Sequence, residues 1–379
     1  MKRILLLTLI LLAACAPLTP STQAPVGNGE PTQPSALEAN IVTEAPLGTQ
    51  ASLPGETVQL TVMTHSSFAI SDSVLAAFEQ ANNIKVTFVA GGDAGEALNK
   101  AILSKDAPLA DVFYGVDNTF LSRALDAGIF EPYGSPLLVN IPDEFHLDPK
   151  NRALPVDYGD VCINYDRAFF EKNALAVPAS LEDLLKPEYN GMLVVENPAT
   201  SSPGLAFLLA TIKHFGEPGY LDFWRALRAN GLVVVNDWET AYYTNFSASS
   251  GRGPQPMVVS YATSPAAEVI YADAQLEQSP TASILGPDTC FRQIEFVGIL
   301  AGTQKRTAAE RFVDFMLGLS FQEDVPLQMF VLPVSPEAFW PDSFHQFVTL
   351  PTEPATLDPE IIAANRDRWI QEWMQAVLQ

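Results

Sequence analysis

A polar loop, Asn197-Pro198-Ala199-Thr200-Ser201-Ser202-Pro203-Gly204, runs directly into an apolar segment, Leu205-Ala206-Phe207-Leu208-Leu209-Ala210. Ser201 or Ser202 suits the N-cap of a helix, Pro203 suits its first turn, and the apolar run predicts that the helix is buried. The start of a helix leaves backbone N–H groups unpaired beside a partial positive charge. The two serines at this helix start would therefore form a binding site for a carboxylate or a phosphate. An ordinary capped helix is the alternative interpretation.

Strand-like and helical segments alternate on both sides of this loop. Short connections rich in Gly, Asp and Ser join them, which predicts an α/β fold with a largely parallel sheet in two units. Ligands of such sheets bind beyond the carboxyl ends of the strands, so the loops 64–68, 91–95 and 116–119 are expected near a site. The predicted strands are 58–63, 84–89, 110–115, 155–166, 191–195, 232–235, 257–261 and 294–300, and a final helix over about 359–378 is expected to pack on the body.

The chain has 379 residues and a formal charge of −23, from 21 Lys and Arg against 44 Asp and Glu. This acidity argues against a nucleic-acid partner, which requires a basic face. It is typical of a secreted or surface protein, and it weakly favours a cationic ligand.

The N-terminus has the features of an export signal. Three residues, Met1-Lys2-Arg3, form a basic start, and an apolar run then ends in Leu12-Ala13-Ala14-Cys15. We expect a lipoprotein signal peptide over 1–14, with Cys15 as the lipidated residue that tethers the protein outside the cytoplasmic membrane. A plain secretory signal is the alternative. Residues 16 to about 56 are rich in Pro, Thr, Ser and Gln, which predicts a flexible linker.

Two cysteines then remain, Cys162 and Cys290. An extracytoplasmic location permits a disulfide between them, and two buried free thiols are the alternative.

Nothing in the sequence is organised for catalysis. The four histidines, at 65, 146, 214 and 345, are scattered, and neither Gly-x-Ser-x-Gly nor His-Glu-x-x-His occurs. The Gly91–Gly95 loop lacks the Gly-Lys-Ser/Thr of a phosphate-binding loop, so a turn-forming role is one interpretation of Asp93. We expect a protein that is not an enzyme and that uses neither a cofactor nor a metal.

Several segments resemble the substrate-binding proteins of bacterial ABC importers, in particular the thiamine-binding branch. The likeness runs from about Leu60 to the C-terminus. Its most specific segments are Trp238-Glu239-Thr240-Ala241-Tyr242 and Ser260-Tyr261-Ala262-Thr263-Ser264-Pro265, and it includes 110–118, 157–159, 200–205 and 369–373.

The resemblance implies a type II-like periplasmic-binding-protein fold, in which two α/β lobes close on a ligand about crossing strands. Lobe 1 would comprise 57–158 and 291–330, lobe 2 would comprise 159–290, and 331–379 would be a helical segment that packs on the body. A disulfide between Cys162 and Cys290 would then pin the hinge. The implied partners are thiamine or a thiamine phosphate ester, an ABC permease with its ATPase subunits, and the membrane through the lipid anchor, with the receptor itself a monomer.

The resemblance also implies the ligand-binding residues. Asp93 would oppose the cation or accept from the aminopyrimidine, with Asp117 as an added acid, and Trp238 and Tyr261 would form aromatic walls. The hydroxyethyl tail or its phosphate would be held by Ser201, Ser202 and Ser264.

The sequence departs from the thiamine-binding pattern where His65, Ala267 and Phe330 replace other residues, and His65 and Phe330 are still expected at the ligand. A receptor for ferric ion or another small cation such as a polyamine is the alternative, with Tyr242-Tyr243 as the only adjacent tyrosine pair for iron.

Overall fold

The computed structural model describes residues 56–248 and 251–379. The predicted signal peptide, the lipidated Cys15 and nearly all of the predicted linker lie outside the described residues. Within the described ranges, no helix is both long and apolar enough to cross a membrane.

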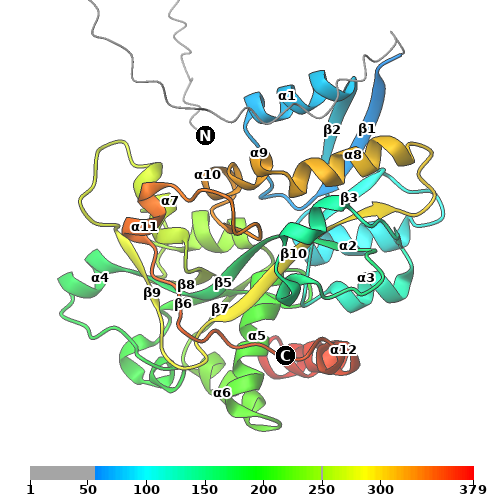
Figure 1. Ribbon diagram of the computed structural model, residues 1–379. Helices are drawn as coiled ribbons and strands as arrows, with labels where there is room; N and C mark the ends of the chain where they lie inside the picture. Colours follow the sequence, from blue (N-terminus) through cyan, green and yellow to red (C-terminus); the bar gives the residue numbers. More distant parts are fainter. Residues whose placement is uncertain (1–55, 249–250) are drawn as a thin grey trace, which may run out of the picture. The chain divides into compact units, whose positions relative to one another are not determined.

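One curled sheet contains two groups of parallel strands (Figure 1). The first group consists of β1 (Val58–Thr64), β2 (Ile84–Ala90) and β3 (Val112–Asp117), and the second consists of β6 (Leu193–Glu196), β7 (Val233–Val235) and β8 (Met257–Tyr261). Two long strands, β5 (Leu154–Asp166) and β10 (Phe291–Leu300), pair antiparallel with each other and join the groups, in the order β2-β1-β3-β10-β5-β8-β6-β7. This arrangement confirms the predicted α/β class, with two mostly parallel units connected by shared strands.

Three short strands pair outside this path: β4 (Phe130–Glu131), β9 (Thr281–Ile284) and β11 (Leu332–Pro333). Helices cover both faces of the sheet, because its central strands are apolar on both sides and must be buried on both. The helices are α1 (Asp72–Asn82), α2 (Ala94–Leu103), α3 (Leu121–Ala127), α4 (Arg167–Lys172), α5 (Ser202–Phe215), α6 (Gly219–Ala229), α7 (Ser264–Ile270), α8 (Arg306–Leu317), α9 (Leu319–Gln322), α10 (Val325–Gln328), α11 (Asp342–Phe347) and α12 (Pro359–Val377). Shorter turns of helix are η1 (Pro136–Asn140), η2 (Asp143–Phe145), η3 (Glu182–Leu185), η4 (Pro187–Tyr189) and the π-helix η5 (Thr240–Asn245).

The C-terminal helix α12 packs on the body as predicted, and it contacts helices of both strand groups. Trp373 is fully buried and meets Trp224 of α6 edge-on, with the ring centroids 5.5 Å apart. On the other side, the guanidinium of Arg366 donates to the hydroxyl of Ser122 in α3 at 3.1 Å. Helix α12 therefore contacts helices that belong to both strand groups.

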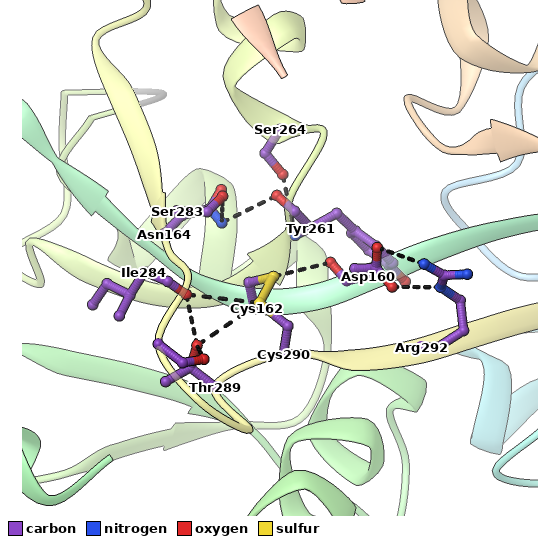
Figure 2. The surroundings of a disulfide bond; sticks show 11 residues. Asp160, Cys162, Asn164, Tyr261, Ser264, Ser283, Ile284, Thr289, Cys290 and Arg292 are labelled. Atoms are coloured by element: carbon purple, nitrogen blue, oxygen red, sulfur yellow. Dashed lines mark hydrogen bonds and ion pairs between the residues drawn. A yellow bond between two sulfur atoms is a disulfide. The ribbon is translucent and has the colours of Figure 1, made fainter. Parts of the chain in front are cut away.

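A disulfide joins Cys162 of β5 to Cys290, the residue before β10 (Figure 2). The neighbouring residues Val161 and Phe291 are register partners, which sets the two cysteines opposite each other with Cα atoms 4.2 Å apart. Both cysteines are buried. The disulfide therefore links the two strands that join the halves of the sheet.

Pro326 lies in the first turn of α10, where its missing N–H costs nothing. Strand β7 is half-buried, because it is the edge of the sheet. One local prediction needs correction. Ser201 occupies the N-cap position of α5, but its hydroxyl makes no capping hydrogen bond.

Candidate functional site

The carboxyl ends of the parallel strands surround a cavity of about 400 Å³. His65 follows β1, Asp93 follows β2, Trp238 follows β7, and Tyr261 ends β8, so both strand groups supply its walls. A cavity at this edge of the sheet is where α/β proteins bind ligands.

Seven of the nine predicted site residues line the cavity. They are His65, Asp93, Ser202, Trp238, Tyr261, Ser264 and Phe330, and Ala267 lines it as well. Ser201 and Asp117 are fully buried and do not line it, because they lie behind the wall where α5 meets the first strand group.

Aromatic rings form one side of the cavity. Trp238 stacks on Tyr242 with centroids 5.0 Å apart and an interplanar angle of 20°, and its indole N–H donates to the hydroxyl of Ser260 at 2.9 Å. The Ser260 and Ser264 hydroxyls are 2.9 Å apart, so Ser264 belongs to the same hydrogen-bonded row. These contacts fix the indole plane before any ligand arrives.

All three departures from the thiamine-binding pattern, His65, Ala267 and Phe330, line the cavity. Ala267 has no aromatic ring where the thiamine-binding pattern has one. Tyr271 lies one helical turn further along the chain and packs edge-on against Phe330, with the ring centroids 5.0 Å apart. Phe330 has φ +56°, a left-handed conformation that is costly for a bulky side chain and is found at ligand-binding positions. Tyr271 therefore supplies a ring on the side where Ala267 lacks one.

Asp93 bridges the two strand groups across the cavity. Its carboxylate accepts from the backbone N–H of Ala94 at 2.6 Å and from the backbone N–H of Trp238 at 3.0 Å. Burial raises the pKa of Asp93, while these bonds, the Ser201 hydroxyl and His65 act in the opposite direction.

Asp117 is a fully buried acid at the end of β3. Its carboxylate accepts from the Thr119 hydroxyl at 2.7 Å and from the backbone N–H groups of Thr119 and Phe120. Burial raises the pKa of Asp117 to about 7, the charge of Glu295 adds to this, and the hydrogen bond from Thr119 opposes it. The hydroxyls of Ser201 and Ser202 lie near carboxyl groups of the protein itself, Ser201 near Asp93 and Ser202 near Asp117, but neither makes a hydrogen bond of normal geometry.

A buried acid on β10 reaches the cavity floor. Glu295 lies 3.5 Å from Nε2 of His65, and the hydroxyl of Tyr114 is 3.1 Å from the same carboxylate. Gly115 makes room for the imidazole, since a Cβ there would lie 2.3 Å from His65 Cδ2. Burial alone would lower the pKa of His65, but the carboxylate of Glu295 raises it above its ordinary value, with help from Asp93 and Glu239.

The surroundings of the cavity are acidic. Asp93, Glu268, Asp273 and Glu295 line it, and His65 is the only basic side chain among its lining residues in the described part of the chain. A smaller adjoining cavity of about 360 Å³ shares His65 and Asp93, and its other ionisable lining residues are Glu96, Asp237 and Glu239. The combined space therefore favours a cation over an anion.

Sequence reasoning missed Glu295, Gln293, Glu268 and Tyr271, all of which line the cavity, and considered Tyr242 only for the alternative iron site. A usable signal existed for Glu295, since this acid directly precedes an apolar run, Phe296-Val297-Gly298-Ile299-Leu300, in the same strand. Tyr242 donates to Glu268 at 2.5 Å, so this member of the tyrosine pair is already engaged. Within residues 56–248 and 251–379, no three His, Cys, Asp or Glu side chains gather as metal ligands do.

Comparison with known proteins places the chain in a family. Residues 107–347 match the bacterial extracellular solute-binding proteins. The chain is 30% identical over 330 residues to the thiamine-binding periplasmic protein of Escherichia coli K12, which covers 84% of this chain and 93% of that protein. The corresponding protein of Brucella suis is 28% identical over 323 residues, covering 84% of this chain and 91% of its own length.

Solved structures agree with this assignment. A periplasmic thiamin binding protein matches with a TM-score of 0.73 and 30% identity, over 84% of this chain and 96% of its own. AfuA from Actinobacillus pleuropneumoniae, solved with fructose-6-phosphate, shares the fold with a TM-score of 0.72 at 20% identity, over 84% of this chain and 98% of its own. Iron-bound HitA from Pseudomonas aeruginosa shares it with a TM-score of 0.66 at 19% identity, over 83% and 99%. The chain is therefore a member of the bacterial extracellular solute-binding proteins, with the two-lobe fold of the periplasmic binding proteins and a clear similarity to those that bind thiamine.

Proposed function

We propose that this protein is the thiamine receptor of an ABC importer. Membership of the solute-binding family accounts for a small-molecule ligand, an extracytoplasmic location and delivery to a permease with its ATPase subunits. The observation that supports thiamine is the cavity itself, in which a fixed indole plane faces acidic side chains. A flat, positively charged thiazolium gains from stacking and cation–π contact on one side and from the carboxylates on the other.

We propose the free vitamin as the preferred form over its phosphate esters. A phosphate binds best to Arg, Lys or an open helix start. The lining residues of the described chain include neither Arg nor Lys, and the serines at the start of α5 face Asp93 and Asp117. Each added phosphate charge would therefore meet several acids and a single basic side chain, His65, which already lies beside Glu295.

The rival ligands fit this cavity less well. A ferric site of this fold class would need phenolate oxygens, but burial and the nearby Glu268 raise the pKa of Tyr242 well above its usual value. A polyamine would be attracted by the acids, yet it would leave the stacked face of Trp238 without a flat partner.

We also propose how the receptor is built around the site. Closure would occur about β5 and β10, with Asp93 and Trp238 meeting across the cavity as the halves come together. The parts are those expected from the sequence: a signal peptide over 1–14, a lipidated Cys15 and linker to 56, lobe 1 over 57–158 and 291–330, lobe 2 over 159–290, and a C-terminal segment over 331–379. The receptor would act as a monomer tethered to the membrane by its lipid.

Thermal unfolding with a panel of ligands tests the proposal. A ligand that binds only the folded state raises the melting temperature, with about 2.7 kcal/mol of stabilisation at 100 times its Kd. We expect a large shift with thiamine, smaller shifts with thiamine monophosphate and pyrophosphate, and none with putrescine or ferric citrate. A shift with ferric citrate or putrescine alone would contradict the assignment of thiamine.

A further inference from the structure

Glu295 is an acid in a position where burial should exclude one. It lies in the middle of β10, the strand between β3 and β5, and only 7% of its surface is exposed. Its carboxylate nevertheless lines the cavity, at the floor between the two strand groups. A buried carboxylate is costly unless a positive charge or hydrogen bonds compensate it, so its partners define its role.

Three groups surround this carboxylate. His65 approaches from the loop after β1 with Nε2 at 3.5 Å, Tyr114 approaches from β3 with its hydroxyl at 3.1 Å, and Asp157 is its register partner on β5. The Tyr114 hydroxyl is closer to Asp157, at 2.6 Å, and it can donate only one hydrogen bond. Of the three neighbours of the Glu295 carboxylate, only His65 is basic.

The protons of this cluster are distributed unequally. Burial and the charge of Glu295 raise the pKa of Asp157 well above its usual range, so Asp157 is the carboxyl that keeps a proton. Burial alone would also raise the pKa of Glu295, but the nearby His65 and the proton of Asp157 hold it below its usual range. The negative charge at the floor thus resides on Glu295.

We propose that Glu295 is the counter-ion for the positive ring of the bound ligand, and that a protonated His65 takes this place while the cavity is empty. This inference rests on the proposed function, because it requires a cationic ligand. When the ligand cation enters, it and a protonated His65 share one carboxylate at close range, and the two positive charges repel each other. Binding therefore favours the neutral imidazole, and a proton leaves His65.

The sign of the pH dependence follows from the groups that face His65. These are Glu295 on β10, Asp93 before α2 and Glu239 before η5, which are all acids, together with the ring of Tyr114. They keep His65 protonated at low pH. Thiamine affinity should then rise with pH through the His65 titration, by up to about tenfold per pH unit below it, and level off above.

A matched pair of the same type lies away from the cavity. His214 on α5 is 2.8 Å from Glu182 and 3.1 Å from Asp288, and acids likewise raise its pKa against the effect of burial. Neither His214 nor Glu182 lines either cavity. The variant Glu182→Gln is therefore a control for the removal of an acid beside a histidine whose pKa is raised.

The test is isothermal titration of the full-length protein with thiamine from about pH 6 to about pH 8.5, where a histidine titrates. The probes are thiamine and 3-deazathiamine, its neutral carbon isostere. We expect Glu295→Gln to weaken thiamine binding by at least about tenfold while changing the affinity for the neutral isostere far less. His65→Phe should flatten the pH dependence of thiamine binding, whatever its absolute affinity, and Glu182→Gln should match the wild type in both affinity and pH dependence. Proton release, measured in buffers of different ionisation enthalpy, should occur for wild type and not for His65→Phe.

The outcomes separate this inference from the proposed function. Tight thiamine binding with equal losses for both probes in Glu295→Gln, or with no proton release in wild type, would overturn the counter-ion role and leave the thiamine receptor intact. A lack of thiamine binding by wild type would overturn the proposed function instead. An NMR titration of His65 without ligand then tests the pair directly: we expect its pKa to fall in Glu295→Gln, and an unchanged value would overturn the pairing.

Discussion

The Oδ2 atom of Asp93 accepts a hydrogen bond from the backbone N–H of Trp238 at 3.0 Å. This bond connects the residue before α2 with the loop after β7, and so it joins the two parallel strand groups across the cavity. It fixes the position of the indole that forms the aromatic wall, and it brings a carboxylate to the same wall. The Asp93 side chain therefore both connects the two strand groups and places a carboxylate at the cavity.

The variant Asp93→Asn should weaken thiamine binding by at least about tenfold, because it removes a buried charge and one of two acceptor oxygens at the junction. The measurement is isothermal titration, with Asp222→Asn as the control, since Asp222 is exposed on α6 and pairs with Arg225. An affinity equal to that of wild type would show that Asp93 serves only as a helix cap.

Gly95 allows α2 to approach the loop before α5. A Cβ at this position would lie 2.8 Å from the backbone oxygen of Thr200, which no real Cβ contact tolerates. The variant Gly95→Ala should therefore hold the halves apart and weaken thiamine binding by about tenfold, which corresponds to about 1.4 kcal/mol. Because alanine favours helix, the unliganded protein should not lose stability through α2 itself.

The control for Gly95→Ala is Gly219→Ala on α6, where the added Cβ would meet only Phe215 Cβ at 3.4 Å. Small-angle scattering with and without thiamine gives the degree of closure. If Gly95→Ala closed fully and bound as tightly as Gly219→Ala, the approach of α2 to Thr200 would not limit closure.

Removing the aromatic wall should weaken ligand binding in a graded way. A cation–π contact over a desolvated ring contributes about 1–2 kcal/mol, so Trp238→Ala should weaken thiamine binding by about fivefold to thirtyfold and Trp238→Phe by less. Quenching of tyrosine and tryptophan fluorescence measures both affinities, with Trp340→Phe as the control outside the cavity. Equal affinities for Trp238→Ala and wild type would remove Trp238 from the site.

The disulfide between Cys162 and Cys290 closes a sequence separation of 128 residues. The double variant Cys162→Ser, Cys290→Ser should lower the free energy of unfolding by about 2–5 kcal/mol, through the larger freedom of the unfolded chain. Thiamine affinity should change less than about threefold, since the β5–β10 ladder still joins the halves. Urea denaturation with and without reductant measures the difference, and an undiminished stability of the double variant would contradict it.

The buried Asp117 should make stability depend on pH. Its pKa is about 7 in the folded protein, raised mainly by burial, and about 3.9 in an unfolded chain. Between these values the folded state holds a proton that the unfolded state lacks, so this group lowers stability as pH rises from about 4 to about 7.

Asp117→Asn removes that titration and can keep the acceptor for Thr119 and Phe120. The variant should gain free energy of unfolding relative to wild type as pH rises, by as much as about 4 kcal/mol at the upper end. Urea denaturation at pH values on both sides of the titration measures this gain. Parallel stability curves for the two proteins would contradict the raised pKa.

Local pattern predicts much of this fold, because strands, helices and loops alternate in the order that parallel units require. The predicted loops at the carboxyl ends of the strands contain His65 and Asp93, the resemblance implied Trp238, and all three line the cavity. The proximity of Ser201 to Asp93 and of Ser202 to Asp117 was not predictable, since it depends on how the two strand groups meet.

Glu295 was not predicted as a site residue, for a different reason. An acid in a strand usually points to solvent, and only the central place of β10 between β3 and β5 buries it. Likewise, the π-helix η5 has the same local sequence signals as an α-helix. Sequence alone therefore located the cavity but not the charge at its floor.

Isothermal titration of the full-length protein with thiamine tests the account most directly. The account predicts one site per chain with a Kd of about 1 μM or lower. An absence of measurable heat at millimolar thiamine, in protein that is folded by circular dichroism, would contradict it.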